Sequence, residues 1–286
     1  MLGSFINILP LIGSVSLQSN TFSMDKASLY KLSRFYNQKR ELSQEFWADF
    51  FEETGRFLSD GEKRWLDVGC GSGRIVLPLA NCFPNSWFLG MDISIDMLSQ
   101  LGRSASAQKD IKNISILQAD MNCPLPIINS LFDCVCLFQT IHYFNMESVY
   151  NQLSGFVSEG SFLIIASTTH DQFKELPYCA YTPVLNYEIA RTPDSDKIEK
   201  DAQINGLKVM FRKDYAIYQE ASSQIHIENY LRSLPYSAFC ILDEDKLEEA
   251  IEATLCTINE GTFKAGFMID SFRLTIFKYV KPERGT

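Results

Sequence analysis

The most restrictive feature of this 286-residue sequence is a glycine-rich segment that follows a short apolar run. It reads WLDVGCGSGR over residues 65–74. Glycines at such a point let the backbone adopt conformations that larger residues avoid, and let a ligand approach the main chain closely. A buried strand over Arg64–Gly69, a glycine turn and a helix from about Arg74 to Cys82 therefore predict a site for a nucleotide-like cofactor.

The spacing of the glycines separates two classes of cofactor. A dinucleotide loop has the pattern G-x-G-x-x-G, with the pyrophosphate at the helix N-terminus; here Gly73 comes one residue too early. Asp67 also places a carboxylate beside the loop, which repels a pyrophosphate and attracts the ammonium and sulfonium charges of S-adenosylmethionine. The loop thus favours S-adenosylmethionine, and a nicotinamide-dependent oxidoreductase is the disfavoured alternative.

Two further acidic residues stand at the ends of predicted strands. Asp92 follows Gly73 by 19 residues and ends the strand 87–92, where a carboxylate can accept hydrogen bonds from both ribose hydroxyls. Asp120 follows the strand 114–118 and can accept a hydrogen bond from the adenine amino group, while Met121 can pack against the ring. Each aspartate alone is equally a helix cap or turn former.

The segments LDVGCGSG (66–73), GMDIS (90–94), QADM (118–121) and FDCV (132–135) together resemble the class I S-adenosylmethionine-dependent methyltransferase family, in its small-metabolite branch of types 11 and 25. The resemblance covers about residues 25–170. It implies that Asp92 holds the ribose, Asp120 with Met121 the adenine and the glycine loop the methionine portion. The cofactor-binding candidates are Tyr36 and Arg40 in the N-terminal helices, Asp67, Gly69, Cys70, Gly71, Gly73, Asp92, Ile93, Met97, Asp120, Met121 and Gln139.

Further strands predicted at 132–138 and 161–167 alternate with helices, which favours parallel pairing with helices on both faces. The expected fold class is α/β: a Rossmann-like class I methyltransferase fold with a mostly parallel seven-stranded sheet and a cap insertion. We expect a flexible tail at 1–24, a helical lid at 25–62, a core at 63–170 and 240–286, and a substrate-binding cap at 171–239. Within the cap, strand-like runs are expected at Leu207–Phe211 and Tyr215–Tyr218, and the closing strand of the core is expected at Phe272–Val280.

Residues 138–144 follow the fourth predicted strand and should face the donated methyl group. His142 and His170 are the candidate general bases, because both follow strands at the ligand-binding edge and imidazole titrates near neutral pH. Tyr143 is the third candidate catalytic residue, and His226 is a poorer choice of base. For any of these histidines, a hydrogen-bonded or exposed residue without a chemical role is the alternative.

The acceptor is left open by the sequence. Three tyrosines of the expected cap, Tyr178, Tyr181 and Tyr187, can form an aromatic pocket for a planar or cationic acceptor, or can be core residues. A carboxylate acceptor would instead require a basic clamp such as Arg191 or Arg212. Oxygen and nitrogen acceptors are not distinguished.

The formal charge of −9 disfavours nucleic acid as a partner, because affinity for a polyanion comes largely from Lys and Arg. The Asn/Asp-Pro-Pro-aromatic tetrad that many nucleic-acid amino methyltransferases carry is also absent. The eight cysteines lack paired C-x-x-C motifs, so we expect reduced thiols and no metal site. Residues 1–17 are too short and interrupted to span a membrane. We expect a cytoplasmic monomer or homodimer; a non-catalytic S-adenosylmethionine-binding subunit and a nucleic-acid methyltransferase are the alternatives.

Overall fold

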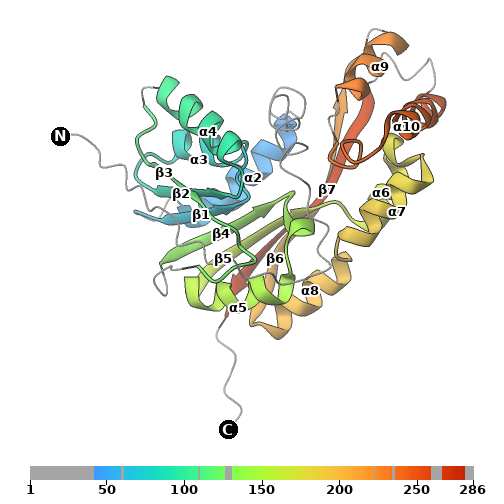
Figure 1. Ribbon diagram of the computed structural model, residues 1–286. Helices are drawn as coiled ribbons and strands as arrows, with labels where there is room; N and C mark the ends of the chain where they lie inside the picture. Colours follow the sequence, from blue (N-terminus) through green and yellow to red (C-terminus); the bar gives the residue numbers. More distant parts are fainter. Residues whose placement is uncertain are drawn as a thin grey trace.

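The computed structural model describes residues 42–58, 61–108, 110–125, 131–221, 223–233, 236–258 and 266–280 (Figure 1). The strands are β1 (Arg64–Val68), β2 (Trp87–Asp92), β3 (Ile114–Gln118), β4 (Phe132–Phe138), β5 (Val157–Ser167), β6 (Leu207–Gln219) and β7 (Phe267–Tyr279). The helices are α2 (Gln44–Leu58), α3 (Val76–Cys82), α4 (Ile95–Ala107), η1 (Ile141–Tyr143), α5 (Met146–Phe156), α6 (His170–Glu175), η2 (Pro177–Cys179), α7 (Thr182–Arg191), α8 (Ser195–Ile204), α9 (Gln224–Arg232) and α10 (Glu244–Thr257).

All seven strands form one sheet in the order β3-β2-β1-β4-β5-β7-β6. Strands β1 to β5 pair in parallel, and β7 runs antiparallel to both β5 and β6. The central strands are apolar along nearly their whole length because helices cover both faces of the sheet. The predicted α/β class and the mostly parallel seven-stranded sheet are confirmed.

The structure differs from the predicted cap of residues 171–239 in one part. Residues 207–219 form β6, which is the edge strand of the main sheet and pairs with β7 along most of its length. The sequence suggested two short strands here because the charged run Arg212–Asp214 interrupts the apolar pattern. Alternate side chains of an edge strand face solvent, however, so charges are compatible with a continuous strand.

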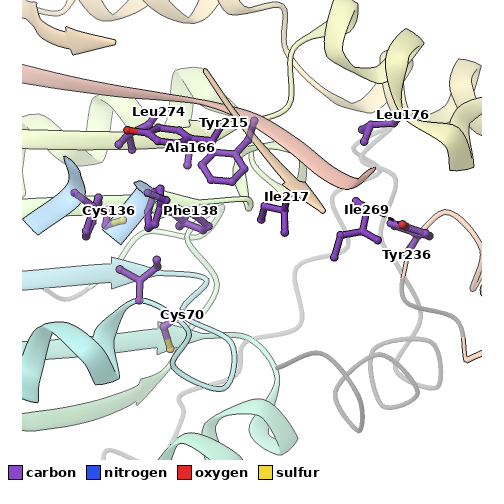
Figure 2. Close-up of a cluster of buried hydrophobic side chains, with 14 of the residues drawn as sticks. Cys70, Cys136, Phe138, Ala166, Leu176, Tyr215, Ile217, Tyr236, Ile269 and Leu274 are labelled. Carbon is purple, nitrogen blue, oxygen red and sulfur yellow. Dashed lines mark hydrogen bonds between the residues drawn. The ribbon is translucent and has the colours of Figure 1, made fainter. Parts of the chain in front are cut away.

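Two hydrophobic clusters lie on the two faces of the sheet. In the first, α2 packs against the sheet through Phe46, whose ring lies 5.3–5.6 Å from the rings of Phe138, Tyr215 and Phe272. Figure 2 shows part of this cluster, with Phe138 and Tyr215 among its labelled residues. Residues 25–41 of the predicted lid, and the predicted tail 1–24, lie outside the described residues. Helix α2 is therefore the described part of the segment expected as a lid.

The long strands β6 and β7 continue past the end of β5 towards α9 and α10 (Figure 1), and β7 contacts η2. The Tyr236 ring stacks on that of Tyr178 at 3.8 Å between centroids, and its hydroxyl donates a hydrogen bond to the carbonyl oxygen of Ile269. These contacts join η2, the Tyr236 segment and β7. Strand β7 begins at Phe267, five residues before the predicted start, and Ile269 in this extension accepts the hydrogen bond from Tyr236.

Candidate functional site

Three glycines shape the turn between β1 and α3. Gly69, Gly71 and Gly73 have φ angles of +71°, +55° and +98°, in the left-handed region that residues with a β-carbon avoid. The backbone N–H groups of Gly69 and Cys70 both donate to the carbonyl oxygen of Met91, at 2.7 and 3.0 Å. The turn is therefore fixed against β2, and its path requires the glycines.

Asp67 is the next-to-last residue of β1, and only 2% of its surface is exposed. The backbone N–H of Val76, at the start of α3, donates a hydrogen bond to its carboxylate. The Oδ2 atom has no hydrogen-bond partner among the described residues. Burial, and then the negative charge of Asp92, raise the pKa of Asp67 to about 7. A buried carboxylate with one unsatisfied oxygen fits a cationic ligand.

Asp92 is the last residue of β2, directly beside the glycine turn. Its Oδ2 accepts a hydrogen bond from the backbone N–H of Gly71 at 2.9 Å, and its Oδ1 accepts one from that of Ser94 at 2.8 Å. Burial raises the pKa of Asp92, while the backbone donors oppose this effect. Two acidic side chains thus lie at one turn.

Three other cofactor candidates surround this turn. A β-carbon on Gly71 would lie 3.9 Å from Sδ of Met97, so this methionine faces the turn from α4. The Cys70 side chain packs beneath the turn against β2, and burial raises the pKa of its thiol. Ile93 is 55% exposed, which leaves an apolar surface next to Asp92 on which a nucleoside ring can pack.

Asp120 forms a turn after β3. Its Oδ1 accepts hydrogen bonds from the backbone N–H and the side-chain amide of Asn122, at 2.8 and 3.1 Å. Asp120 therefore forms a turn, which is the alternative role that its place after a strand suggested. Met121 is buried in the second hydrophobic cluster.

Asn122 was not predicted as a site residue. Its side-chain amide also donates to the carbonyl oxygen of Tyr143 at 3.1 Å, and its Oδ1 accepts from the backbone N–H of Asn145 at 2.8 Å. Asn122 therefore ties the Asp120 turn to the segment after β4. The sequence around it indicates a turn but gives no signal for these long-range contacts.

Gln139 directly follows β4 and has a φ of +57°, the only positive φ of a non-glycine residue among those described. Its backbone N–H donates to the carbonyl oxygen of Ala166, and its Nε2 lies 3.4 and 3.5 Å from the two carboxylate oxygens of Asp270. Asp270, on β7, was not predicted. It lies before the predicted start of the closing strand at Phe272, so the sequence did not place it in the sheet.

His142 and Tyr143 lie in η1, and their ring centroids are 4.1 Å apart. The guanidinium carbon of Arg191 lies 5.7 Å from the centre of the Tyr143 ring. Arg191 is itself nearly buried: its Nε donates to Glu188 at 2.7 Å, and its Nη2 donates to Ser237 at 2.8 Å. The structure therefore brings Tyr143 next to a cation that is already paired with a carboxylate.

His170 is the first residue of α6. Its Nε2 lies 2.8 Å from the carbonyl oxygen of Thr192, and its Nδ1 lies 3.5 Å from the carboxylate of Asp194. Both ring nitrogens thus have partners in the connection between α7 and α8. These contacts favour a role in holding that connection over a role in proton transfer.

The remaining candidates are dispersed. Tyr178 stacks on Tyr236 in the core, the Tyr181 hydroxyl donates to Glu249, and Tyr187 lies over Arg191. Each predicted pocket tyrosine therefore has a different neighbour.

Arg212 donates two hydrogen bonds to Glu199, and His226 is exposed on α9. Tyr36 and Arg40 lie outside the described residues.

Other features predicted from the sequence can be compared with the described part of the chain. All eight cysteines are free. The described residues contain no cluster of three or more side chains that could hold a metal ion. No described helix combines the length and the apolar character needed to cross a membrane.

The chain resembles known proteins in sequence and in fold. The family model described as a methyltransferase domain matches residues 59–223. A malonyl-[acyl-carrier protein] O-methyltransferase of Legionella pneumophila is 29% identical over 142 residues, which are 49% of this chain and 48% of that protein. A second protein of that name, from Ilyobacter polytropus, is 22% identical over 74% of both chains. The chain thus matches about half the length of the Legionella relative.

Among solved structures, one described as a methyltransferase of an antibiotic biosynthesis pathway in Anabaena variabilis superposes with a TM-score of 0.61. The two sequences are 16% identical, and the match covers 82% of this chain and 97% of the Anabaena chain. This likeness concerns the fold, which is the Rossmann-like fold of methyltransferases. Together with the family match over more than half of the sequence, the glycine turn and its two carboxylates show that the chain belongs to the class I S-adenosylmethionine-dependent methyltransferases.

Proposed function

We propose that this methyltransferase moves the methyl group of S-adenosylmethionine to an oxygen or nitrogen atom of a small molecule. The observation that carries the proposal is a pair of carboxylates, the buried Asp67 and the half-buried Asp92, at a turn formed by glycines with positive φ. Such a turn accepts a ligand close to the backbone, and the two acids favour a cation over a phosphate.

The residues present at the turn fit this cofactor. The unsatisfied Oδ2 of Asp67 is a buried acceptor that a positively charged group would satisfy. We propose that Asp92 binds the ribose hydroxyls and that the exposed Ile93 side chain packs against the base. Met97 would contact the cofactor from the side of the turn near Gly71. Asp120 and Gln139 remain proposed contacts at the ends of β3 and β4.

When bound, S-adenosylmethionine supplies an electrophilic methyl group on a sulfonium. The chain's own tasks are to align an acceptor in line with that methyl group and to exclude water. We assign the acceptor side to the segment after β4, which holds Gln139, His142 and Tyr143. His142 is the proposed base for an acceptor that must lose a proton, since both ring nitrogens of His170 already have partners.

The net charge and the sequence relatives both support a small-molecule acceptor. The net charge of −9 disfavours a polyanionic substrate. The names of the two relatives above describe them as O-methyltransferases that act on a malonyl group carried by a protein. An acceptor that is a small metabolite, either free or attached to a carrier protein, is consistent with both observations.

The test uses the purified full chain. Titration calorimetry should show binding of S-adenosylmethionine, and tritiated methyl groups should be transferred to members of a panel of small alcohols, phenols, amines and carboxylic acids. Asp92→Ala should weaken cofactor binding by roughly 1–3 kcal/mol through loss of hydrogen bonds. Asp96→Ala, at an exposed acid on α4, is the matched control. Equal affinity in both variants, or tight binding of reduced nicotinamide cofactor, would contradict the proposal.

A further inference from the structure

Arg74 places a positive charge between the cofactor turn and the end of β4. It directly follows Gly73, the last glycine of the turn, and its guanidinium carbon lies 5.5 Å from the ring centre of Phe138, the last residue of β4. Each of its three side-chain nitrogens is buried. Because a guanidinium stays protonated in proteins, the charge at this place is permanent.

The guanidinium of Arg74 belongs to a different part of the site from the two acids of the cofactor turn. The groups that lower the pKa values of Asp67 and Asp92 are backbone N–H donors, and burial outweighs them in both cases. A guanidinium in contact with either carboxylate would lower its pKa. Asp67 and Asp92 therefore face the proposed position of the cationic cofactor, whereas Arg74 faces β4.

The end of β4 is the proposed acceptor side. Thr140, two residues after Phe138, donates a hydrogen bond from its Oγ1 to the carbonyl oxygen of Val68, which precedes the cofactor turn. The Phe138 ring also lies 5.2 Å from that of Phe272 on β7. Arg74 thus borders both the turn that would bind the methyl donor and the strand end at which the acceptor would meet the methyl group.

A guanidinium at such a place fits a carboxylate ligand. Its planar fork can donate two parallel hydrogen bonds to the two carboxylate oxygens, and the ion pair is stronger where water is excluded. Because a guanidinium has five N–H donors, Arg74 can keep contacts with the protein on one edge and hold a ligand on another. The Oδ2 atom of Asp67 is buried as well, so the cofactor and the acceptor both require the site to open before they bind.

A second arginine near the acceptor side is matched with a carboxylate of the protein. The guanidinium carbon of Arg191 lies 5.7 Å from the ring centre of Tyr143, and its Nε donates to Glu188 at 2.7 Å. The side chains of Arg191 and Glu188 are only 5% and 3% exposed. An acidic ligand at Arg191 would place two carboxylates side by side in a buried site, which is unfavourable.

An acid on β7 adds a constraint on the orientation of the acceptor. Asp270 is only 4% exposed, and the side-chain nitrogen of Gln139 lies 3.4 and 3.5 Å from its two oxygens. A carboxylate placed beside Asp270 would be repelled, whereas one at Arg74 would be attracted. The two charges together favour an acidic acceptor whose carboxylate points to the cofactor turn.

We infer that Arg74 binds the carboxylate of the methyl acceptor, and that the acceptors of this enzyme are organic acids. The inference rests on the proposed function and names the class of the small molecule. Arg74 recognises a charge that the acceptor already carries before the reaction. Its removal should therefore raise the KM of the acceptor more than it lowers kcat.

The experiment compares acids with their amides, which have nearly the same shape but no negative charge. The acids are butanoate, octanoate, phenylacetate and mandelate, and transfer of tritiated methyl groups to any atom of the acceptor is counted. The wild-type enzyme should prefer an acid to its amide by at least about tenfold in kcat/KM. Arg74→Gln should reduce this preference by roughly 10- to 100-fold, mainly through the KM of the acid, and should leave the affinity for S-adenosylmethionine unchanged within about threefold.

Two further variants complete the design. Arg103→Gln makes the same exchange at an exposed arginine on α4 and should leave the preference unchanged. Arg74→Lys keeps the positive charge but loses the planar fork, so its KM for the acid should lie between those of the wild type and Arg74→Gln. This variant keeps the inference testable if Arg74→Gln does not fold.

Absence of transfer to the acids, equal use of acids and amides by the wild type, or equal preferences in Arg74→Gln and Arg103→Gln would overturn this inference and leave the proposed function standing. A loss of affinity for S-adenosylmethionine in Arg74→Gln, with an unchanged preference for acids, would also overturn it, because Arg74 would then bind the carboxylate of the cofactor. Failure of the wild-type protein to bind S-adenosylmethionine would overturn the proposed function itself.

Discussion

A β-carbon added to Gly69 would lie 2.5 Å from Cγ2 and 2.9 Å from Cβ of Thr140. The backbone of the turn after β1 therefore packs against the side chain of Thr140 in the segment after β4. Thr140 Oγ1 also donates a hydrogen bond to the carbonyl oxygen of Val68, at 3.1 Å. Because Gln139 precedes Thr140, this contact links the cofactor turn to the proposed acceptor side. Glycine at position 69 is thus required by its conformation and by the space available.

Gly69→Ala should lower the free energy of unfolding by roughly 2–5 kcal/mol, the sum of the cost of a positive φ and of overpacking. Thr140→Ser removes the Cγ2 atom and keeps the hydroxyl, so it should restore part of the loss in the double variant. Urea unfolding of the four proteins measures both effects. Strictly additive losses would show that the two residues do not share this contact.

The raised pKa of Asp67 predicts a pH dependence of stability. The folded protein holds the Asp67 proton more tightly than the unfolded chain, so the stability from this proton is fully present below the ordinary pKa of 3.8. It is lost as pH rises through about 7. Asp67→Asn, which stays neutral, should therefore be more stable than the wild type at about pH 8, by roughly 1–3 kcal/mol. Thermal unfolding between about pH 5 and 8 measures the difference.

The same group predicts the pH dependence of cofactor binding, with the opposite sign. A cation favours ionised Asp67, so the affinity for S-adenosylmethionine should rise as pH increases through about 7 and then level off. Asp67→Asn should bind more weakly and lose this dependence. Calorimetry in buffers of different ionisation enthalpy should detect proton release in the wild type only. An unchanged profile in the variant would assign the titration to another group.

The places in the fold of the candidate residues that end a strand or form the glycine turn could be predicted, because an apolar run, a glycine turn and an acid at a strand end are each visible in a short stretch of sequence. Asp67, Gly71 and Asp92 are such residues. Asn122 and Asp270 were missed because their roles depend on partners far along the chain, Tyr143 and Gln139 respectively. No local pattern marks an aspartate on an edge hairpin as a site residue.

The same distinction applies to the fold. The strands 87–92, 114–118 and 132–138 were predicted with the observed bounds because each is a short, mainly apolar run before a turn. Strand β6 was divided and assigned to the cap because it is an edge strand whose charged residues face solvent. Its stability comes from pairing with β7, which is a tertiary contact.

The pair of Arg191 and Glu188 predicts a large effect of removing one partner. Their side chains are 5% and 3% exposed, and the shortest distance between their charged atoms is 2.6 Å. Arg191→Met should destabilise the protein by roughly 3–5 kcal/mol, because it leaves a buried carboxylate without its cation. The double variant with Glu188→Leu should recover much of this loss. Equal stability of the single and double variants in chemical unfolding would mean that Glu188 finds another partner.

The contacts of His170 predict that it supports structure and does not transfer protons. His170→Phe keeps an aromatic ring but loses the contacts with Thr192 and Asp194, so unfolding should require roughly 1–3 kcal/mol less free energy. Its pH profile of kcat should keep the same ionisations as the wild type, because the proposed base is intact. His142→Gln should show the reverse, a lost ionisation and a lower kcat with little change in stability. If His170→Phe instead loses the ionisation, the proton acceptor lies at the end of β5 and not at the end of β4.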